Sequence, residues 1–192
     1  MAQHGWLIDL DRCIGCHSCT VACNSEQNTA PTKSPLFFKG GNIQSPANLS
    51  YRRVVVREGG TYPNVWRTFI TSACNHCQEP ACMKSCPVNA ISKRASDGIV
   101  LIDQDKCNGC KYCVWACPYG APQWNELSKK VEKCTMCVTR IDKGLQPACA
   151  TTCVGKALTY VPEFNPAESG LNAPEGFANP ALTKPSTKFA KK

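Results

Sequence analysis

Cysteine is the residue type that decides what chemistry this chain can do. The chain has sixteen cysteines among its 192 residues, arranged in four groups of four. The groups are Cys13, Cys16, Cys19 and Cys23; Cys74, Cys77, Cys82 and Cys86; Cys107, Cys110, Cys113 and Cys117; and Cys134, Cys137, Cys149 and Cys153. Thiolates are soft ligands that select iron–sulfur clusters, copper(I) or zinc. Because each [4Fe–4S] cluster takes four thiolates, the count predicts four such clusters and a chain that conducts electrons.

The spacing of the third group favours clusters over the other uses of cysteine. It reads C-x2-C-x2-C-x3-C-P from Cys107 to Pro118, which is the run of bacterial two-cluster ferredoxins. Structural zinc sites are usually built from paired CxxC knuckles or mixed Cys/His sets, whereas this chain has only three histidines. The long gap between Cys137 and Cys149 would suit zinc if the fourth group stood alone. The tight C-x2-C spacings also argue against a disulfide framework.

Short apolar stretches recur at fixed places around the cysteine groups. They precede the first and third groups and follow the second and fourth, at residues 6–9, 99–103, 90–91 and 157–160. One strand therefore leads into a group and another leads out of its partner group, which is typical of a ferredoxin fold with internal pseudo-twofold symmetry. We predict an α+β chain with two such modules, one inserted in the other.

The same symmetry predicts which cysteines share a cluster, because the fourth cysteine of each run in two-cluster ferredoxins ligates the other cluster. In the inner module this exchange joins Cys74, Cys77 and Cys82 with Cys117, and Cys107, Cys110 and Cys113 with Cys86. In the outer module it joins Cys13, Cys16 and Cys19 with Cys153, and Cys134, Cys137 and Cys149 with Cys23.

The predicted organisation follows from these pairs. The outer module takes residues 1–23 and 118–161, the inner module residues 74–117, an insertion residues 24–73 and a tail residues 162–192. Residues 33–50 are rich in Pro, Gly, Asn and Ser and predict a loop. Two β-branched and aromatic stretches, 51–57 and 65–70, predict a hairpin within the insertion. The tail has five prolines and few periodic apolar positions, so we expect it to lie extended on a partner or to remain mobile.

Several residues inside the motifs are expected to support clusters without ligating them. Gly15 and Gly109 stand in equivalent places where the backbone must wrap closely around a cluster, which a glycine permits. His17 and His76 are expected to donate hydrogen bonds behind the ligands or to lie at the surface. The aromatic residues around the third group are expected to shield a cluster from water rather than to relay electrons; they are Tyr112, Trp115 and Tyr119.

The net charge of +8 does not indicate nucleic-acid binding. A [4Fe–4S] core with four thiolates carries about −2, so four of them contribute about −8 and bring the loaded chain near neutrality. The basic residues are also dispersed and form no continuous stripe, which is the footprint that a nucleic acid requires. Lys and Arg are better explained as charges that offset the clusters.

Membrane and catalytic signals are missing from the sequence. No apolar stretch approaches the length of a membrane helix, and the first residues lack the basic and apolar regions of a signal peptide. We therefore expect that another subunit holds the chain at any membrane where it works. No paired carboxylates, Ser/His/Asp set or Gly-rich phosphate loop stands out, so we expect a non-catalytic electron-transfer subunit.

These motifs give the chain a strong resemblance to a known family. It resembles the four-cluster iron–sulfur (B) subunits of complex molybdenum oxidoreductases, most of all the electron-transfer subunit of dimethyl sulfoxide reductase. The likeness runs from about residue 6 to residue 161 and is carried by residues 9–16, 74–82, 116–125 and 133–137. The cysteine pattern is specific for this class of subunit and only weakly specific for the substrate.

The resemblance implies a complex of several subunits. A large catalytic subunit would hold a bis-pterin guanine dinucleotide centre with molybdenum or tungsten, and an integral membrane subunit would oxidise quinol. This chain would join them through four [4Fe–4S] clusters, at the periplasmic or the cytoplasmic face of the membrane. The alternatives are an electron-transfer subunit of a formate dehydrogenase, hydrogenase, or polysulfide or arsenate reductase, and, in another class, a zinc-stabilised binding module.

Overall fold

The computed structural model describes residues 2–29 and 49–190 and shows a mixture of small sheets and short helices. The strands are β1 (Gly5–Asp9), β2 (Arg53–Thr61), β3 (Asn64–Ser72), β4 (Ile91–Lys93), β5 (Val100–Ile102), β6 (Gln123–Asn125), β7 (Lys130–Glu132), β8 (Leu158–Val161) and β9 (Thr187–Ala190). The helices are α1 (Ser18–Glu26), α2 (Ala81–Lys84), α3 (Tyr112–Ala116), α4 (Val138–Ile141) and α5 (Ala148–Thr151). Most of the predicted loop at 33–50 lies outside the described residues.

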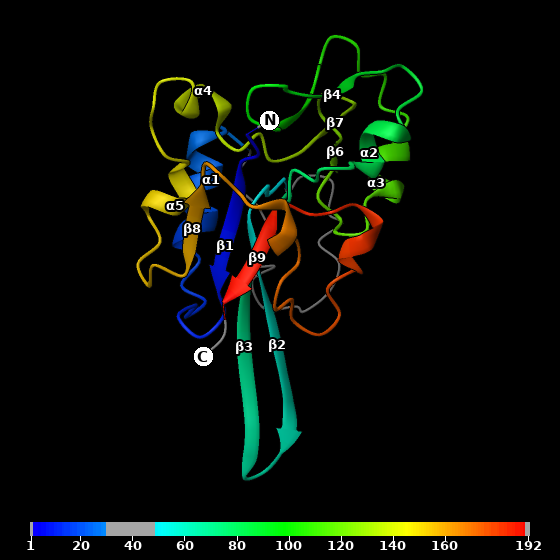
Figure 1. Cartoon of the computed structure of the whole chain (residues 1–192). Coiled ribbons are helices and arrows are strands. Elements are labelled where there is room, and N and C mark those ends of the chain that lie inside the picture. Colours follow the sequence, from blue (N-terminus) through cyan, green and yellow to red (C-terminus); the bar gives the residue numbers. More distant parts are fainter. Residues whose placement is uncertain (1, 30–48, 191–192) are drawn as a thin grey trace.

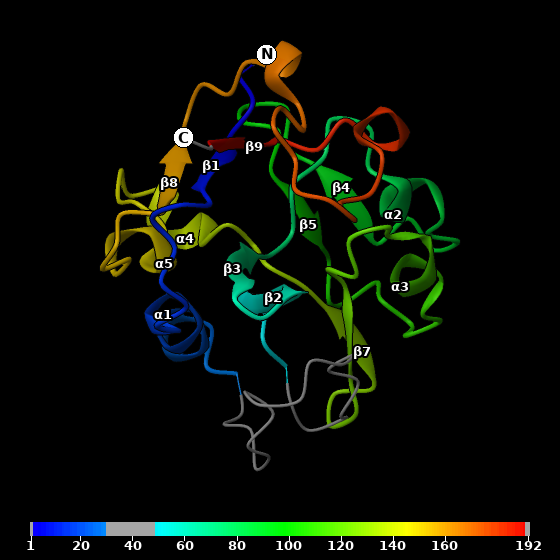
Figure 2. The same cartoon turned by 90° about the horizontal axis from the view of Figure 1, so that it is seen from below.

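The elements gather on two sides of the molecule, as two ferredoxin-like modules require. Helices α1, α4 and α5 lie on one side with β1 and β8, and helices α2 and α3 lie on the other (Figures 1 and 2). Strand β1, which precedes the first cysteine group, pairs antiparallel with β8, which follows the last group. The apolar stretches at 90–91 and 99–103 meet in a hairpin of β4 and β5, whose turn includes Gly98 with a φ of +71°.

The hairpin of β6 and β7 lies within residues 118–161, which are predicted to belong to the outer module. Val131 of β7 is 1% exposed and packs with Cys82, Ile91 and Cys113, which belong to the inner module. Val131 and the half-buried Trp124 therefore pack against the predicted inner module, whose own strands β4 and β5 are only three residues long.

The insertion forms the predicted hairpin, which projects from the body of the molecule (Figure 1). Strands β2 and β3 pair from Arg53 opposite Ser72 to Thr61 opposite Asn64, so the ladder is longer than predicted. Gly59 explains part of this extension. The ring of Trp66 lies 2.8 Å from the position that a Cβ of residue 59 would occupy, so the missing side chain lets the indole lie across the strand.

The tail folds back onto its own chain, and the expectation that it lies on a partner or remains mobile is wrong for residues 162–190. Strand β9 pairs parallel with the edge of β1 that β8 leaves open. Phe164 and Phe189 are each 3% exposed, and Lys188 contacts Glu168 at 2.6 Å. A few well-placed aromatic residues fix the segment, although their irregular spacing gave no periodic signal in the sequence.

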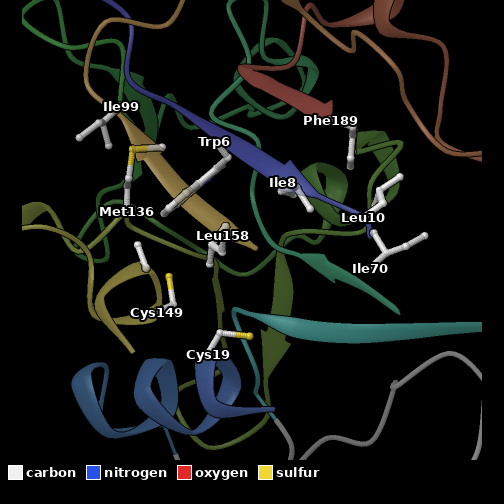
Figure 3. Close-up of a cluster of buried hydrophobic side chains, with 11 residues drawn as sticks. Trp6, Ile8, Leu10, Cys19, Ile70, Ile99, Met136, Cys149, Leu158 and Phe189 are labelled. Carbon is white, nitrogen blue, oxygen red and sulfur yellow. The ribbon is translucent and has the colours of Figure 1, made fainter. Parts of the chain in front are cut away.

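The hydrophobic core is built partly from cysteine. The largest cluster packs Trp6, Ile8 and Leu158 with Cys19 and Cys149 (Figure 3). The two smaller clusters also contain cysteines, from the first, second and fourth groups in one case and from the second and third in the other. The places where thiols gather are therefore the places where the chain packs. None of the helices within residues 2–29 and 49–190 is long and apolar enough to cross a membrane.

Candidate metal centres

The structure brings the sixteen cysteines together in four sets, each of which combines three cysteines of one group with the fourth of another. Set I is Cys13, Cys16, Cys19 and Cys153; set II is Cys23, Cys134, Cys137 and Cys149; set III is Cys74, Cys77, Cys82 and Cys117; set IV is Cys86, Cys107, Cys110 and Cys113. These are the combinations that the exchange of fourth ligands predicts.

Set I lines a shallow hollow at the surface, together with Val54, Thr71 and Ala157. Burial raises the pKa of Cys13, and the neighbouring thiolates of Cys19, Cys153 and Cys16 raise it further. Cys16 is exposed, and hydrogen bonds from Ser18 lower its pKa. Within set I, Cys19 is therefore buried in the protein and Cys16 is exposed to solvent.

Set IV is arranged in the same way in the inner module. Its four cysteines line a shallow hollow, together with Ile91, Ile102 and Val131. Burial raises the pKa of Cys113 to about 11, and the negative charges of the Cys107, Cys110 and Cys86 thiolates contribute to the increase. Cys110 is exposed, whereas Cys86 and Cys107 are half-buried. The equivalence of Cys16 and Cys110 follows the internal repeat of the sequence.

Sets II and III lie deeper in the molecule. All four cysteines of set II are buried, and burial raises the pKa of Cys23 to about 12. In set III, burial raises the pKa of Cys77 and of Cys82 to about 12. Thiols with such pKa values keep their protons at neutral pH. A coordinated metal displaces the proton and supplies the positive charge that makes a buried thiolate tolerable, so these residues fit a metal group.

The four sets do not have the geometry of a mononuclear site. Within the described ranges, which include every cysteine, no three Cys, His, Asp or Glu side chains are placed to hold one metal ion. The sulfur ligands of a zinc ion would each lie about 2.3 Å from a common centre. The cysteines of sets I and IV instead stand around the walls of hollows.

A common backbone turn shapes all four motifs. The residue before the second cysteine of each group has a positive φ: Gly15 at +69°, His76 at +42°, Gly109 at +72° and Met136 at +57°. Close packing explains the glycines, since a Cβ would lie 2.4 Å from the Phe69 ring at Gly15 and 2.3 Å from the Lys129 carbonyl oxygen at Gly109. Both glycines have the positive φ that glycine permits, and their close contacts are to Phe69 and to the Lys129 carbonyl; the close approach to a cluster stays a prediction.

The same turn at His76 and Met136 could not be predicted from residue type. Both side chains are fully buried, and packing holds the backbone in a region that L-residues rarely adopt. The Nδ1 atom of His76 accepts a hydrogen bond from the Val100 amide at 3.0 Å. Burial, reinforced by Lys133, keeps the His76 pKa well below its usual value, so the ring is neutral and carries its proton on Nε2.

Comparisons with known proteins agree with this arrangement. Residues 65–162 match a family described as "4Fe-4S dicluster domain", and residues 7–25 match one described as "4Fe-4S binding domain". The chain is 36% identical over 194 residues to the B subunit of anaerobic dimethyl sulfoxide reductase of Escherichia coli, covering 96% of this chain and 86% of that protein. It belongs to the iron–sulfur subunits of molybdenum oxidoreductase complexes.

Other relatives of this iron–sulfur subunit carry different substrate names. The B subunit of sulfite dehydrogenase of Allochromatium vinosum is 40% identical over 166 residues, covering 83% of this chain and 69% of that protein. The B subunit of tetrathionate reductase of Salmonella typhimurium is 43% identical over 155 residues, covering 81% of this chain and 56% of that protein. The present subunit carries [4Fe–4S] clusters, and its sixteen cysteines match a count of four.

Two buried cations accompany the cysteine sets of this iron–sulfur subunit. Arg52 is 1% exposed and Lys133 is 4% exposed. The Lys133 Nζ donates to the carbonyl oxygens of Val100 and Cys134, and its charge favours the thiolates of Cys82 and Cys117. The sequence indicated that basic residues offset the clusters, but only the fold shows which of them are buried.

The aromatic residues beside the third group do not form the expected shield. Trp115 is 77% exposed and Tyr112 is 53% exposed, so both rings face solvent in this chain. Only Tyr119 is half-buried, and its hydroxyl lies 2.9 Å from the hydroxyl of Thr183 in the tail. The tail therefore takes part in covering the inner module.

Proposed function

We propose that the chain passes electrons between a quinol-oxidising membrane subunit and a molybdopterin catalytic subunit of a dimethyl sulfoxide reductase-type complex. In this proposal the cysteines of sets I to IV each ligate one [4Fe–4S] cluster. The observation that carries it is the arrangement of the sets, with two buried sets between two that reach the surface. The similarity to the dimethyl sulfoxide reductase relative over 86% of that protein supports the choice of complex.

The order of the sets follows from the elements that they share. Cys19 of set I and Cys23 of set II lie one helical turn apart on α1. The thiolate of Cys74 in set III acts electrostatically on Cys134 in set II, raising its pKa. Cys113 of set IV lies within α3, and Cys117 of set III ends that helix. The sets therefore follow one another as I, II, III and IV.

The two ends of this row reach solvent through Cys16 and Cys110. We propose that one partner subunit meets the set I end and the other meets the set IV end. A bound cluster supplies one-electron oxidation and reduction. The residues of this chain hold the ligands in a row, exclude water from sets II and III, and offset the added negative charge through Arg52 and Lys133.

The second candidate is an electron-transfer subunit of a sulfite-oxidising complex. The 40% identity to the sulfite dehydrogenase relative is the observation that favours it. Electrons would then leave the molybdenum subunit through this chain instead of entering it. In both cases we propose that a partner holds the complex at a membrane, on the periplasmic side.

Purifying the intact complex from membranes tests these proposals. We expect a molybdenum-containing large subunit to co-purify, a reduced quinol analogue to bleach the iron–sulfur absorbance, and dimethyl sulfoxide to restore it. If sulfite bleaches the absorbance and dimethyl sulfoxide does not restore it, the second candidate is correct. Recovery of the chain without any molybdenum subunit, or with clusters that no quinol reduces, would contradict the leading proposal.

A further inference from the structure

Arg52 is the most completely buried charge of the described chain outside the cysteines. It lies directly before β2 and is 1% exposed. Its guanidinium carbon lies 4.4 Å from the ring centroid of Trp6, and Nη1 donates to the Thr71 hydroxyl at 3.4 Å. The Thr71 hydroxyl in turn lies 3.5 Å from Sγ of Cys19 in set I. One edge of the guanidinium is therefore fixed by the protein.

The other edge of the guanidinium has no acceptor among the described residues. Nε and Nη2 are both buried and make no hydrogen bond there. An arginine stays protonated in proteins, so these N–H groups remain donors. A buried donor without an acceptor loses its hydrogen bonds to water and gains none in return, and this cost is larger when the donor is charged. A purely structural role, stacking on Trp6, would leave that cost uncompensated.

The groups that face Arg52 are cysteine side chains, which become thiolates when they ligate a cluster. Burial acts to lower the pKa of Arg52, and the thiolates of Cys149, Cys134, Cys19 and Cys23 outweigh it and raise the pKa. Three of these four cysteines belong to set II. The neighbouring Arg53 differs, because its guanidinium donates to the carbonyl oxygens of Tyr119 and Gly120.

We propose that Arg52 donates its Nε–H and Nη2–H to sulfur atoms of the cluster held by set II and raises the reduction potential of that cluster. One-electron reduction adds one negative charge, which an adjacent fixed cation and two hydrogen bonds to sulfur stabilise. Burial alone would make the set II cluster hard to reduce, and Arg52 offsets this effect by stabilising the added negative charge. The inference rests on the proposed ligand sets.

Redox titration of the intact complex by electron paramagnetic resonance tests this role, with Arg52→Gln and Arg52→Lys beside the parent. We expect Arg52→Gln to lower one midpoint potential by at least a tenfold change in the reduction constant, about 59 mV for one electron. Arg52→Lys keeps the charge but loses the paired donors, so it should lower the same midpoint by less. The control is Arg67→Gln, because Arg67 is 61% exposed on the hairpin and pairs with Glu58 at 2.7 Å.

Iron content separates this inference from the proposals on which it rests. If Arg52→Gln loses one cluster, the midpoint potential is measured in the Arg52→Lys variant, which we expect to retain all four clusters. Four unchanged midpoints in Arg52→Lys, or four midpoints that fall together in either variant, would overturn the inference. Chemical mediators set the potential, so an error about the partner subunits leaves the result unaffected. A parent with fewer than four signals would instead contradict the ligand sets.

Discussion

Replacing Cys153 by alanine should remove the same cluster as replacing Cys19, although the two residues belong to the last and the first cysteine groups. Both belong to set I, and a cluster that loses one of its four thiolates loses part of its binding site. We expect each single variant to lose about four iron atoms per chain. The double variant Cys19→Ala, Cys153→Ala should lose no more iron than either single variant, because the first substitution already removes the cluster that both residues ligate.

A matched double variant controls for general destabilisation. Cys19→Ala combined with Cys113→Ala removes one ligand from set I and one from set IV, so about eight iron atoms should be lost. Iron and acid-labile sulfide analysis of the purified variants gives both numbers. If the Cys19 and Cys153 losses add, the two residues hold different clusters and the predicted exchange of fourth ligands is wrong.

Removing the iron should unfold the chain. The core clusters contain thiols from every cysteine group, and three of the four sheets in the described residues have only two strands. Two-stranded hairpins are marginally stable alone. The net stability of a folded domain is about 5–15 kcal/mol, and a metal group that binds only the folded state supplies stability of that order. We expect the iron-free chain to show no cooperative thermal transition.

Circular dichroism under anaerobic, reducing conditions measures this effect. The loaded chain should melt in one transition with loss of its near-ultraviolet signal, and the iron-free chain should have no near-ultraviolet signal at any temperature. Rebuilding the clusters with iron and sulfide should restore the transition, which controls for damage during iron removal. A native-like, cooperative transition without iron would show that the apolar core is sufficient.

Much of this arrangement was predictable because a cluster imposes its ligand spacing on the sequence. The C-x2-C spacings and the strands at 6–9 and 99–103 fix local geometry, and the repeat then predicts which groups exchange their fourth cysteine. The β-branched and aromatic stretches at 51–57 and 65–70 likewise predicted the hairpin of β2 and β3. These signals are local, so sequence alone carries them.

The remaining features depend on contacts between distant segments. Phe189 is buried because β9 reaches the open edge of β1, and no pattern within the tail indicates that edge. His76 and Met136 adopt a glycine-like turn because tertiary packing outweighs their backbone preference. Arg52 and Arg53 are adjacent in sequence, and only the fold separates the one that faces set II from the one that caps carbonyl groups.

Four [4Fe–4S] clusters in a row are the feature on which the proposed function depends. Iron, sulfide and protein analysis of the complex, combined with a redox titration by electron paramagnetic resonance, measures them. We expect about sixteen iron atoms attributable to this chain and four separately reducible signals. Four or eight iron atoms per chain, or fewer than four signals in a fully loaded sample, would contradict this arrangement.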